Sequence, residues 1–227
     1  MGGLKVGKSI GVWSVAIVIA VGLAAFGVPP VLAEDGTGNQ VFFKGGFVGF
    51  NSNRGNEFFT DCGVAGANTC GQNNSSTGWY VGAGLDLVLS KNVWGEMDKT
   101  WVIGEIGVQF NRISSETVNG GVSVFTGPNA KTQLTSVTID VSPKIKFMEG
   151  SKLRPWIIPV GLDIMVISPP SNQTQYLDVG VEFGAGVEYD LWKAFKLGLD
   201  GRYHLMSNMT NTDNSYGQVG PYVGISF

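Results

Sequence analysis

The chain has 227 residues, of which 43% are hydrophobic, 15% are charged and 34 are glycine, and its net charge is −3. The charged fraction lies well below the roughly 25% of a typical soluble domain. This composition excludes a charge-rich disordered chain, a coiled coil and a basic nucleic-acid-binding protein. Glycine is abundant without a Gly-X-Y period, which excludes collagen and favours a protein of many strands and turns.

The first 33 residues have the pattern of a secretory signal peptide. Two lysines precede a long uncharged apolar run, and small residues lie just before Glu34. A basic start, an apolar core and a small-residue exit are typical of such signals. A retained membrane anchor is the alternative, although Pro29 and Pro30 would interrupt its helix. We therefore expect a signal peptide at residues 1–33, a short periplasmic tail at 34–40 and a single domain at 41–227.

The rest of the chain alternates between apolar and other residues with a period of two, which is typical of β-strands. Its best apolar stretch after the signal peptide is Pro155–Leu162, far shorter than the roughly 20 residues that a membrane-spanning helix needs. Eight strands are predicted, at Val41–Phe50, Gly78–Ser90, Thr100–Asn111, Thr135–Phe147, Arg154–Ile167, Tyr176–Tyr189, Ala194–Met206 and Gln218–Phe227.

The charged residues of these runs avoid the apolar face of their own strand. In the seventh run, for example, Leu197 and Leu199 alternate with Lys196 and Asp200. The residues predicted to share the non-apolar faces, and to form an ionic network there, are Lys44, Asp86, Glu105, Asp140, Lys144, Lys146, Asp163, Asp178, Glu182, Glu188, Lys196, Asp200, Arg202 and His204. A soluble antiparallel sheet also alternates, but here the polar faces consist mainly of glycine and a few charges, which suits a narrow lumen.

The lengths of the runs match strands that cross a bilayer obliquely, which need about 9–11 residues. An open sheet cannot span lipid because its edge N–H and C=O groups would be unpaired, whereas closure removes the edge. Eight is an even number and among the smallest for closed membrane barrels. The fold class predicted is therefore all-β, an eight-stranded antiparallel up-and-down transmembrane β-barrel.

The predicted connections alternate between long polar loops and shorter turns, as in membrane barrels. Trp94, Trp101, Trp156 and Trp192 lie in or beside the shorter connections. We expect them to form an aromatic belt at the membrane interface; half-buried tryptophans of a soluble core are the alternative.

The last run, GPYVGISF, places apolar residues on one face and ends at Phe227. With the signal peptide and the first strand VFFKGGFVGF, it resembles the small eight-stranded outer-membrane β-barrel family, which includes opacity-type proteins and the membrane domain of outer-membrane protein A. The resemblance covers Val41–Phe227. It implies an outer-membrane location in a Gram-negative-type bacterium, periplasmic termini, contact with outer-membrane lipid, and recognition of Phe227 by the barrel-assembly machinery.

Few residues of the sequence suggest a catalytic or cofactor-binding site. The near-repeats at Gly82–Asp86 and Gly184–Glu188 lack the third glycine and following helix of a dinucleotide site, so no cofactor is expected. His204 with Ser207 and Asp213 has the composition of the triad in lipid A deacylases, but the spacing places His204 and Ser207 on different strand faces. We therefore expect no catalytic residues and no metal.

Cys62 and Cys70 lie in the first long loop. Export to an oxidising compartment favours a disulfide between them; a metal or redox pair is the alternative.

The function expected is that of a barrel whose lumen is plugged by side chains and whose loops serve adhesion, surface interaction or envelope integrity. A narrow porin or a channel for a small hydrophobic ligand is the alternative, and a lipid A-modifying enzyme is a third. Surface partners would bind the long loops, no nucleic-acid partner is expected, and the protein should be a monomer.

The sixth and seventh strands are expected to pair so that Glu182 is opposite Arg202 and Glu188 is opposite Lys196. Two other registers are possible. One opposes the like charges of Glu182 and Asp200, which destabilises a pair of strands. The other opposes Glu182 to His204.

Overall fold

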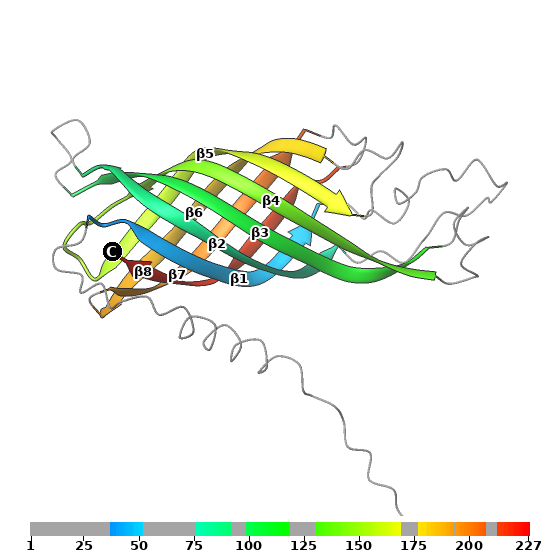
Figure 1. The fold of residues 1–227 in the computed structure, drawn as a ribbon, viewed down its shortest axis with the longest axis horizontal. Helices are drawn as coiled ribbons and strands as arrows, with labels where there is room; N and C mark the ends of the chain where they lie inside the picture. The colour runs from blue at the N-terminus through cyan, green and yellow to red at the C-terminus, as the bar shows by residue number, and fades with distance from the viewer. Residues whose placement is uncertain are drawn as a thin grey trace, which may run out of the picture. The chain divides into compact units, whose positions relative to one another are not determined.

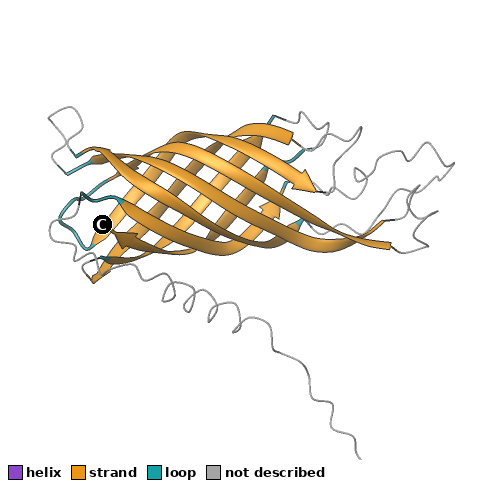
Figure 2. Ribbon diagram, in the orientation of Figure 1, coloured by secondary structure: helices purple, strands orange, loops and turns teal. Residues whose placement is uncertain are grey.

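The computed structural model describes residues 37–51, 76–91, 99–118, 130–168, 177–192, 194–207 and 213–227. The predicted signal peptide, Trp94 and both cysteines lie outside these residues, so their expected roles stay predictions. Nearly all of the described chain is strand (Figures 1 and 2). Among the described residues no helix is long and apolar enough to cross a membrane.

The eight strands form one antiparallel sheet in chain order, which closes where the last strand pairs with the first. The predicted fold class is confirmed. The strands are β1 Gln40–Phe50, β2 Thr77–Ser90, β3 Trp101–Val118, β4 Ala130–Lys146, β5 Leu153–Ser168, β6 Leu177–Trp192, β7 Phe195–Met206 and β8 Tyr216–Ser226. The connections β1–β2, β3–β4, β5–β6 and β7–β8 leave from one end, here called the loop end; the other end is the turn end.

In the closed barrel, each strand is shifted along its length relative to its neighbours. Following ladder partners around the wall leads from Gln40 through Asp86 and Glu105 to Ser142, which is next to Val141, the ladder partner of Leu162. From Gly161, next to Leu162, the path continues through Glu182, His204 and Tyr216 back to β1 at Phe50, ten positions from the start. With about 3.3 Å per residue and about 4.8 Å between strands, this stagger tilts the strands by about 40°. Residues level with one another along the barrel axis are therefore not direct ladder partners.

The pleat separates two chemically different faces, as predicted. On β7, Leu197, Leu199 and Leu205 face outward and are 44–53% exposed. Arg202 and His204 of the same strand face inward and are buried. Because successive side chains alternate across a sheet, one face of each strand meets the interior and the other meets the surroundings.

Two strands, β3 and β4, extend at least five residues beyond their predicted bounds at the loop end. β3 and β4 continue as a paired ribbon as far as Val118 opposite Ala130, and Figure 1 shows them projecting beyond the other strands at the loop end. The continuation is rich in serine and threonine, and a polar sequence gives no alternation of apolar residues from which the strand could be detected.

The predicted register between β6 and β7 is wrong. Glu182 is opposite His204, and Arg202 is opposite Gly184. The ladder extends to Trp192 opposite Phe195, with one irregularity after Asp190. The irregularity after Asp190 shifts the pairing by one residue at the ends of the two strands, and the long Arg202 side chain still reaches Glu182 diagonally.

The predicted aromatic belt is wrong for Trp101 and Trp156, which are 7% and 1% exposed. Trp156 lies inside the barrel, where its indole N–H donates to the Tyr222 hydroxyl at 3.1 Å. An irregularity between Ile158 and Gly161 reverses which residues of β5 face inward, and it accounts for the error at Trp156. Trp192 is 71% exposed at the turn end, in the position expected of a belt residue.

Candidate functional site: the charged barrel interior

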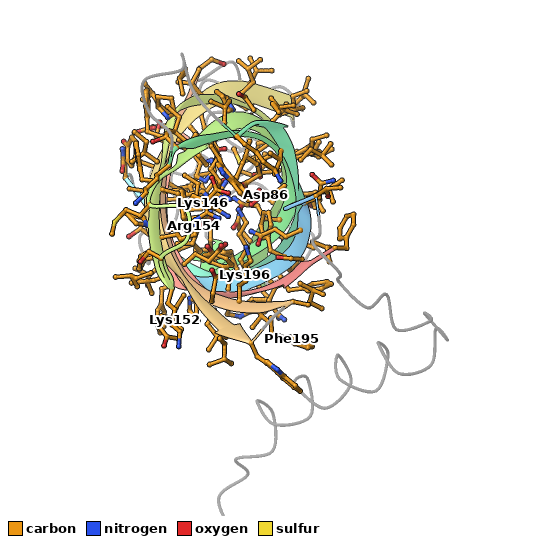
Figure 3. All side chains as sticks on the ribbon, turned by 90° about the vertical axis from the view of Figure 1, so that its left-hand side faces the viewer. Asp86, Lys146, Lys152, Arg154, Phe195 and Lys196 are labelled. Carbon is orange, nitrogen blue, oxygen red and sulfur yellow. The ribbon has the colours of Figure 1, made fainter. Side chains whose placement is uncertain are left out.

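The fourteen ionisable residues that the sequence predicts to share the polar faces are all buried in the barrel interior, none more than 7% exposed. Seen from the turn end, Asp86, Lys146 and Lys196 point inward, whereas Phe195 and Lys152 point away (Figure 3). A buried charge is costly unless it is paired and hydrogen-bonded, so the partners of these groups decide what the interior can do.

Nearest the turn end, Glu188 is the centre of a basic cluster. Its carboxylate accepts from Lys146 Nζ at 3.1 Å and Lys196 Nζ at 3.2 Å. It also accepts from the Tyr222 hydroxyl at 3.0 Å and from the Gln40 amide at 3.0 Å. Four donors converge on one carboxylate, so the negative charge of the buried Glu188 side chain is compensated.

Lys144 links this cluster to the next. Its ammonium donates to both Asp86 oxygens at 3.1 Å and also forms an ion pair with Glu105. It lies 4.6 Å from the centre of the Trp156 ring and 5.0 Å from that of Phe42. Two carboxylates and two aromatic faces therefore hold one ammonium in the interior.

The middle of the barrel is organised around Arg202. Its guanidinium lies 2.6 Å from Glu105, 2.9 Å from Asp200, 3.3 Å from Glu182 and 3.7 Å from Asp140. These acids come from β3, β7, β6 and β4 respectively. One planar cation with five donors thus connects four strands, an arrangement for which arginine is better suited than lysine.

Toward the loop end, His204 Nδ1 lies 2.8 Å from Asp163 Oδ2 and 3.8 Å from Glu182 Oε2. Its ring stacks on Tyr216, with centroids 4.2 Å apart and planes inclined by 13°. The Tyr216 hydroxyl in turn accepts from the Gln109 amide at 2.7 Å. The ring of His204 is therefore held in one orientation.

Apolar side chains occupy the interior between and beyond these charges. A cluster near the loop end consists of Val48, Phe50, Tyr80, Ile113, Met165, Ile167, Met206 and Tyr216. A second, smaller cluster consists of Phe42, Trp156, Ile158 and Tyr222. Together with the ion pairs, these layers fill the lumen with side chains, as the narrow interior of an eight-stranded barrel allows.

The remaining two predicted residues are Lys44 and Asp178. Lys44 is buried, and no hydrogen-bond partner of its Nζ is found among the described residues. Asp178 lies at the loop end, where it accepts from Ser207 Oγ and from the Asn214 amide, both at 2.7 Å.

Sequence reasoning missed one buried charge, Arg154, which is 4% exposed. Its guanidinium lies 4.2 Å from the Trp101 ring, and its Nε donates to the Phe147 carbonyl at 3.4 Å. The irregularity between Ile158 and Gly161 brings Arg154 to the inside. The signal that could have found it is Pro159 within the predicted strand, because proline inside a sheet is confined to edges and bulges.

The structure does not bring His204, Ser207 and Asp213 together as the deacylase comparison would require. His204 contacts Asp163, whereas Ser207 donates to Asp178 and Asp213 accepts from the Ser215 backbone N–H at 3.0 Å. Phe227 is 43% exposed at the turn end, and its backbone N–H donates to the Asn39 carbonyl at 3.0 Å.

The outer face of the wall is apolar. Among the described residues, thirty large hydrophobic side chains are at least 38% exposed, including those of Phe47, Leu162 and Leu199. Of the Asp, Glu, Lys and Arg residues in the strands whose side chains are described, all are buried except Arg112 and Asp190. Arg112 lies toward the loop end of the barrel and Asp190 toward the turn end, so the middle of the outer face carries no charge among the described side chains.

Comparison with known proteins matches no family model and no curated protein. Among solved structures, the chain is similar to the outer membrane protein OprG from Pseudomonas aeruginosa, with 10% identity and a TM-score of 0.49 over 85% of this chain and 97% of that one. It is also similar to the outer membrane enzyme PagL, with 12% identity and a TM-score of 0.47 over 83% of this chain and 99% of that one. The N-terminal β-barrel domain of Pseudomonas aeruginosa OprF gives 14% identity and a TM-score of 0.41 over 85% and 99%. At these values the likeness assigns no role.

Proposed function

We propose that this protein is an integral outer-membrane β-barrel with a sealed lumen, which anchors the segments at its loop end for a surface-interaction or envelope-integrity role. The apolar outer face supports the membrane part of this proposal. Monomeric soluble proteins rarely expose a contiguous apolar surface larger than a few hundred Å². A closed barrel satisfies its backbone hydrogen bonds internally and can place such a surface in lipid.

The observation that carries the sealed lumen is the burial of every predicted interior charge, at 7% exposure or less. The charges that line a water-filled pore would be accessible to solvent. Here Arg202 is engaged by four carboxylates and Glu188 by four donors. An ion crossing the barrel would have to separate these groups, and the apolar cluster near the loop end would oppose its passage.

The projecting ribbon of β3 and β4 supports the surface role. Its ladder continues past the irregularity at Arg112–Ser115, through Glu116 opposite Thr132, to Val118 opposite Ala130. This polar extension is not needed to span a bilayer, because about 9–11 residues suffice. It offers a paired, and hence pre-organised, platform for a partner outside the membrane.

Electrical conductance of the refolded protein in planar bilayers tests the sealed lumen. We expect no stepwise conductance from the wild-type protein. A matched variant that opens the loop end, Ile113→Ala with Tyr216→Ala, should conduct and shows that inserted barrels are detected. Regular conductance steps from the wild-type protein would instead support the narrow-channel alternative.

A hollow of about 400 Å³ near the loop end favours a second candidate function, the binding of a small apolar ligand. It is lined by Phe47, Gly49, Thr77, Gly217 and Val219, among others. Its volume lies within the range of small-molecule sites. Gly49 lies on the same face of β1 as the exposed Phe47, and a Cβ on Gly49 would meet nothing within 4 Å, so Gly49→Phe should obstruct the hollow from that face. Saturable binding of an apolar fluorescent probe that this variant abolishes would support the second function.

A further inference from the structure

We propose that Asp163, Glu182 and His204 form a binding site for one divalent transition-metal ion in the barrel interior. The three residues project inward from the adjacent strands β5, β6 and β7. Glu182 and His204 are direct ladder partners, and Asp163 lies two residues from Gly161, the ladder partner of Glu182. Their exposures are 1%, 0% and 0% respectively.

The spacing of the ligand atoms suits such an ion. One nitrogen or oxygen from each residue lies within 4.8 Å of the others. His204 Nδ1 is 2.8 Å from Asp163 Oδ2 and 3.8 Å from Glu182 Oε2. Around an ion with metal–ligand distances of about 2.0–2.2 Å, adjacent ligand atoms are about 3.0–3.6 Å apart. The two distances from His204 Nδ1 are within a few tenths of an ångström of this range, and the ligand oxygens of Asp163 and Glu182 lie within 4.8 Å of each other.

The second observation is a set of buried polar atoms without partners. Asp163 Oδ1 is buried and has no hydrogen-bond partner among the described residues. Both carboxylate oxygens of Asp140 also lack one, and Asp140 is the direct ladder partner of Asp163. Like charges directly opposite each other destabilise a strand pair unless something compensates them.

The permanent cations nearby do not provide that compensation for Asp163. Its only ion-pair partner among the described residues is His204, whereas Arg202 is shared by four other acids. Arg202 also lies 3.3 Å from Glu182 Oε2, and Glu182 Oε1 accepts from Ser142. Arg202 competes with the proposed metal ion for the Glu182 carboxylate. The carboxylates around Arg202 nevertheless outnumber the cations, which favours an additional positive charge there.

The ligand set selects the class of ion. One imidazole and two carboxylates suit Zn²⁺ and related first-row ions, whereas Mg²⁺ and Ca²⁺ prefer oxygen ligands alone. Two carboxylates balance the charge of a divalent ion, and the imidazole binds in its neutral form. When Nδ1 binds the ion, the ring proton resides on Nε2 instead of on Nδ1. Stacking on Tyr216 already holds the ring in place.

The test uses the mature chain without a polyhistidine tag, so that His204 is the single histidine. Because the site is buried, the protein is refolded with and without Zn²⁺ and then dialysed against a chelator. We expect about one retained Zn²⁺ per barrel. With ¹⁵N-labelled histidine, NMR should show the ring proton moving to Nε2 in the Zn²⁺-loaded protein.

Asp163→Asn and His204→Gln should each lower the retained Zn²⁺ by about tenfold or more. Asp86→Asn is the matched control, since it removes a buried acid outside the cluster and should leave retention unchanged. Folding of each variant is checked by heat-dependent gel mobility. If a variant fails to fold, the wild-type NMR result alone decides. Wild-type protein that retains no Zn²⁺ and keeps its histidine spectrum, or equal retention by the variants, would overturn the site.

Discussion

Replacing Arg202 by methionine tests whether one buried cation holds the middle of the barrel together. Methionine keeps much of the side-chain volume but removes the charge from four carboxylates. Breaking a buried ion pair by removing one partner costs about 3–5 kcal/mol, because the remaining charge is stranded. We expect a loss of that size in the free energy of unfolding.

The four acids should not suffer equally. Glu105 keeps its ion pair with Lys144, and Glu182 keeps the hydrogen bond from Ser142. Asp200 has no hydrogen-bond or ion-pair partner other than Arg202 among the described residues. Asp140, 3.7 Å from Arg202, likewise has no other ion-pair partner among the described residues. Most of the cost should therefore come from Asp200 and Asp140.

The double change Arg202→Met with Asp200→Asn should recover about 1–3 kcal/mol of the loss, since it removes a stranded charge and leaves a neutral amide. Arg202→Met with Glu182→Gln should also be less harmful than Arg202→Met alone, but should recover less. The assay is urea unfolding in lipid vesicles, followed by tryptophan fluorescence and gel mobility.

Lys152→Met is the control, because Lys152 is exposed near the turn end. It should change the free energy of unfolding by less than about 0.5 kcal/mol. The reasoning is refuted if Arg202→Met costs under about 1 kcal/mol, or if the effects of Arg202→Met and Asp200→Asn simply add.

Three further predictions concern the wall, the chain end and the first loop. Arginine at Val181 or Leu199, both on the outer face, should cost about 2–4 kcal/mol in lipid if these positions lie near mid-bilayer, and unchanged refolding into vesicles would contradict the face assignment. Deleting Phe227 should lower outer-membrane levels in cells while changing the urea midpoint of refolded protein little, and normal cellular levels would argue against a role as assembly signal. Cys62 and Cys70 should resist an impermeant maleimide on unreduced cells and react after reduction; labelling of both thiols without reductant would disprove the disulfide.

The inward and outward faces of the strands could be predicted from the sequence because the pleat is a local property. Each side chain points to the side opposite its neighbour, so the position of Leu199 assigns that of Asp200 without knowledge of any other strand. All fourteen ionisable residues predicted on the polar faces are buried inside for this reason. The same rule failed at Trp156 and Arg154, because one irregularity in β5 reverses the alternation and leaves no mark in the pattern of apolar residues.

Which residues of different strands meet depends on the register of every strand pair, and no single segment of the sequence determines that register. Glu182 pairs with His204 rather than with Arg202 in a ladder that contains an irregularity after Asp190, which the alternation of apolar residues does not reveal. The sequence predicted that the polar faces hold both acids and bases, but not that Arg202 gathers four acids or that Asp163 joins Glu182 and His204. These groups meet because the stagger of ten residues accumulates around the whole wall before β8 closes on β1. The alternation along a strand can thus be predicted from the sequence itself. The stagger of the closed barrel is the sum of the register shifts at every turn and bulge, so only the tertiary structure determines it.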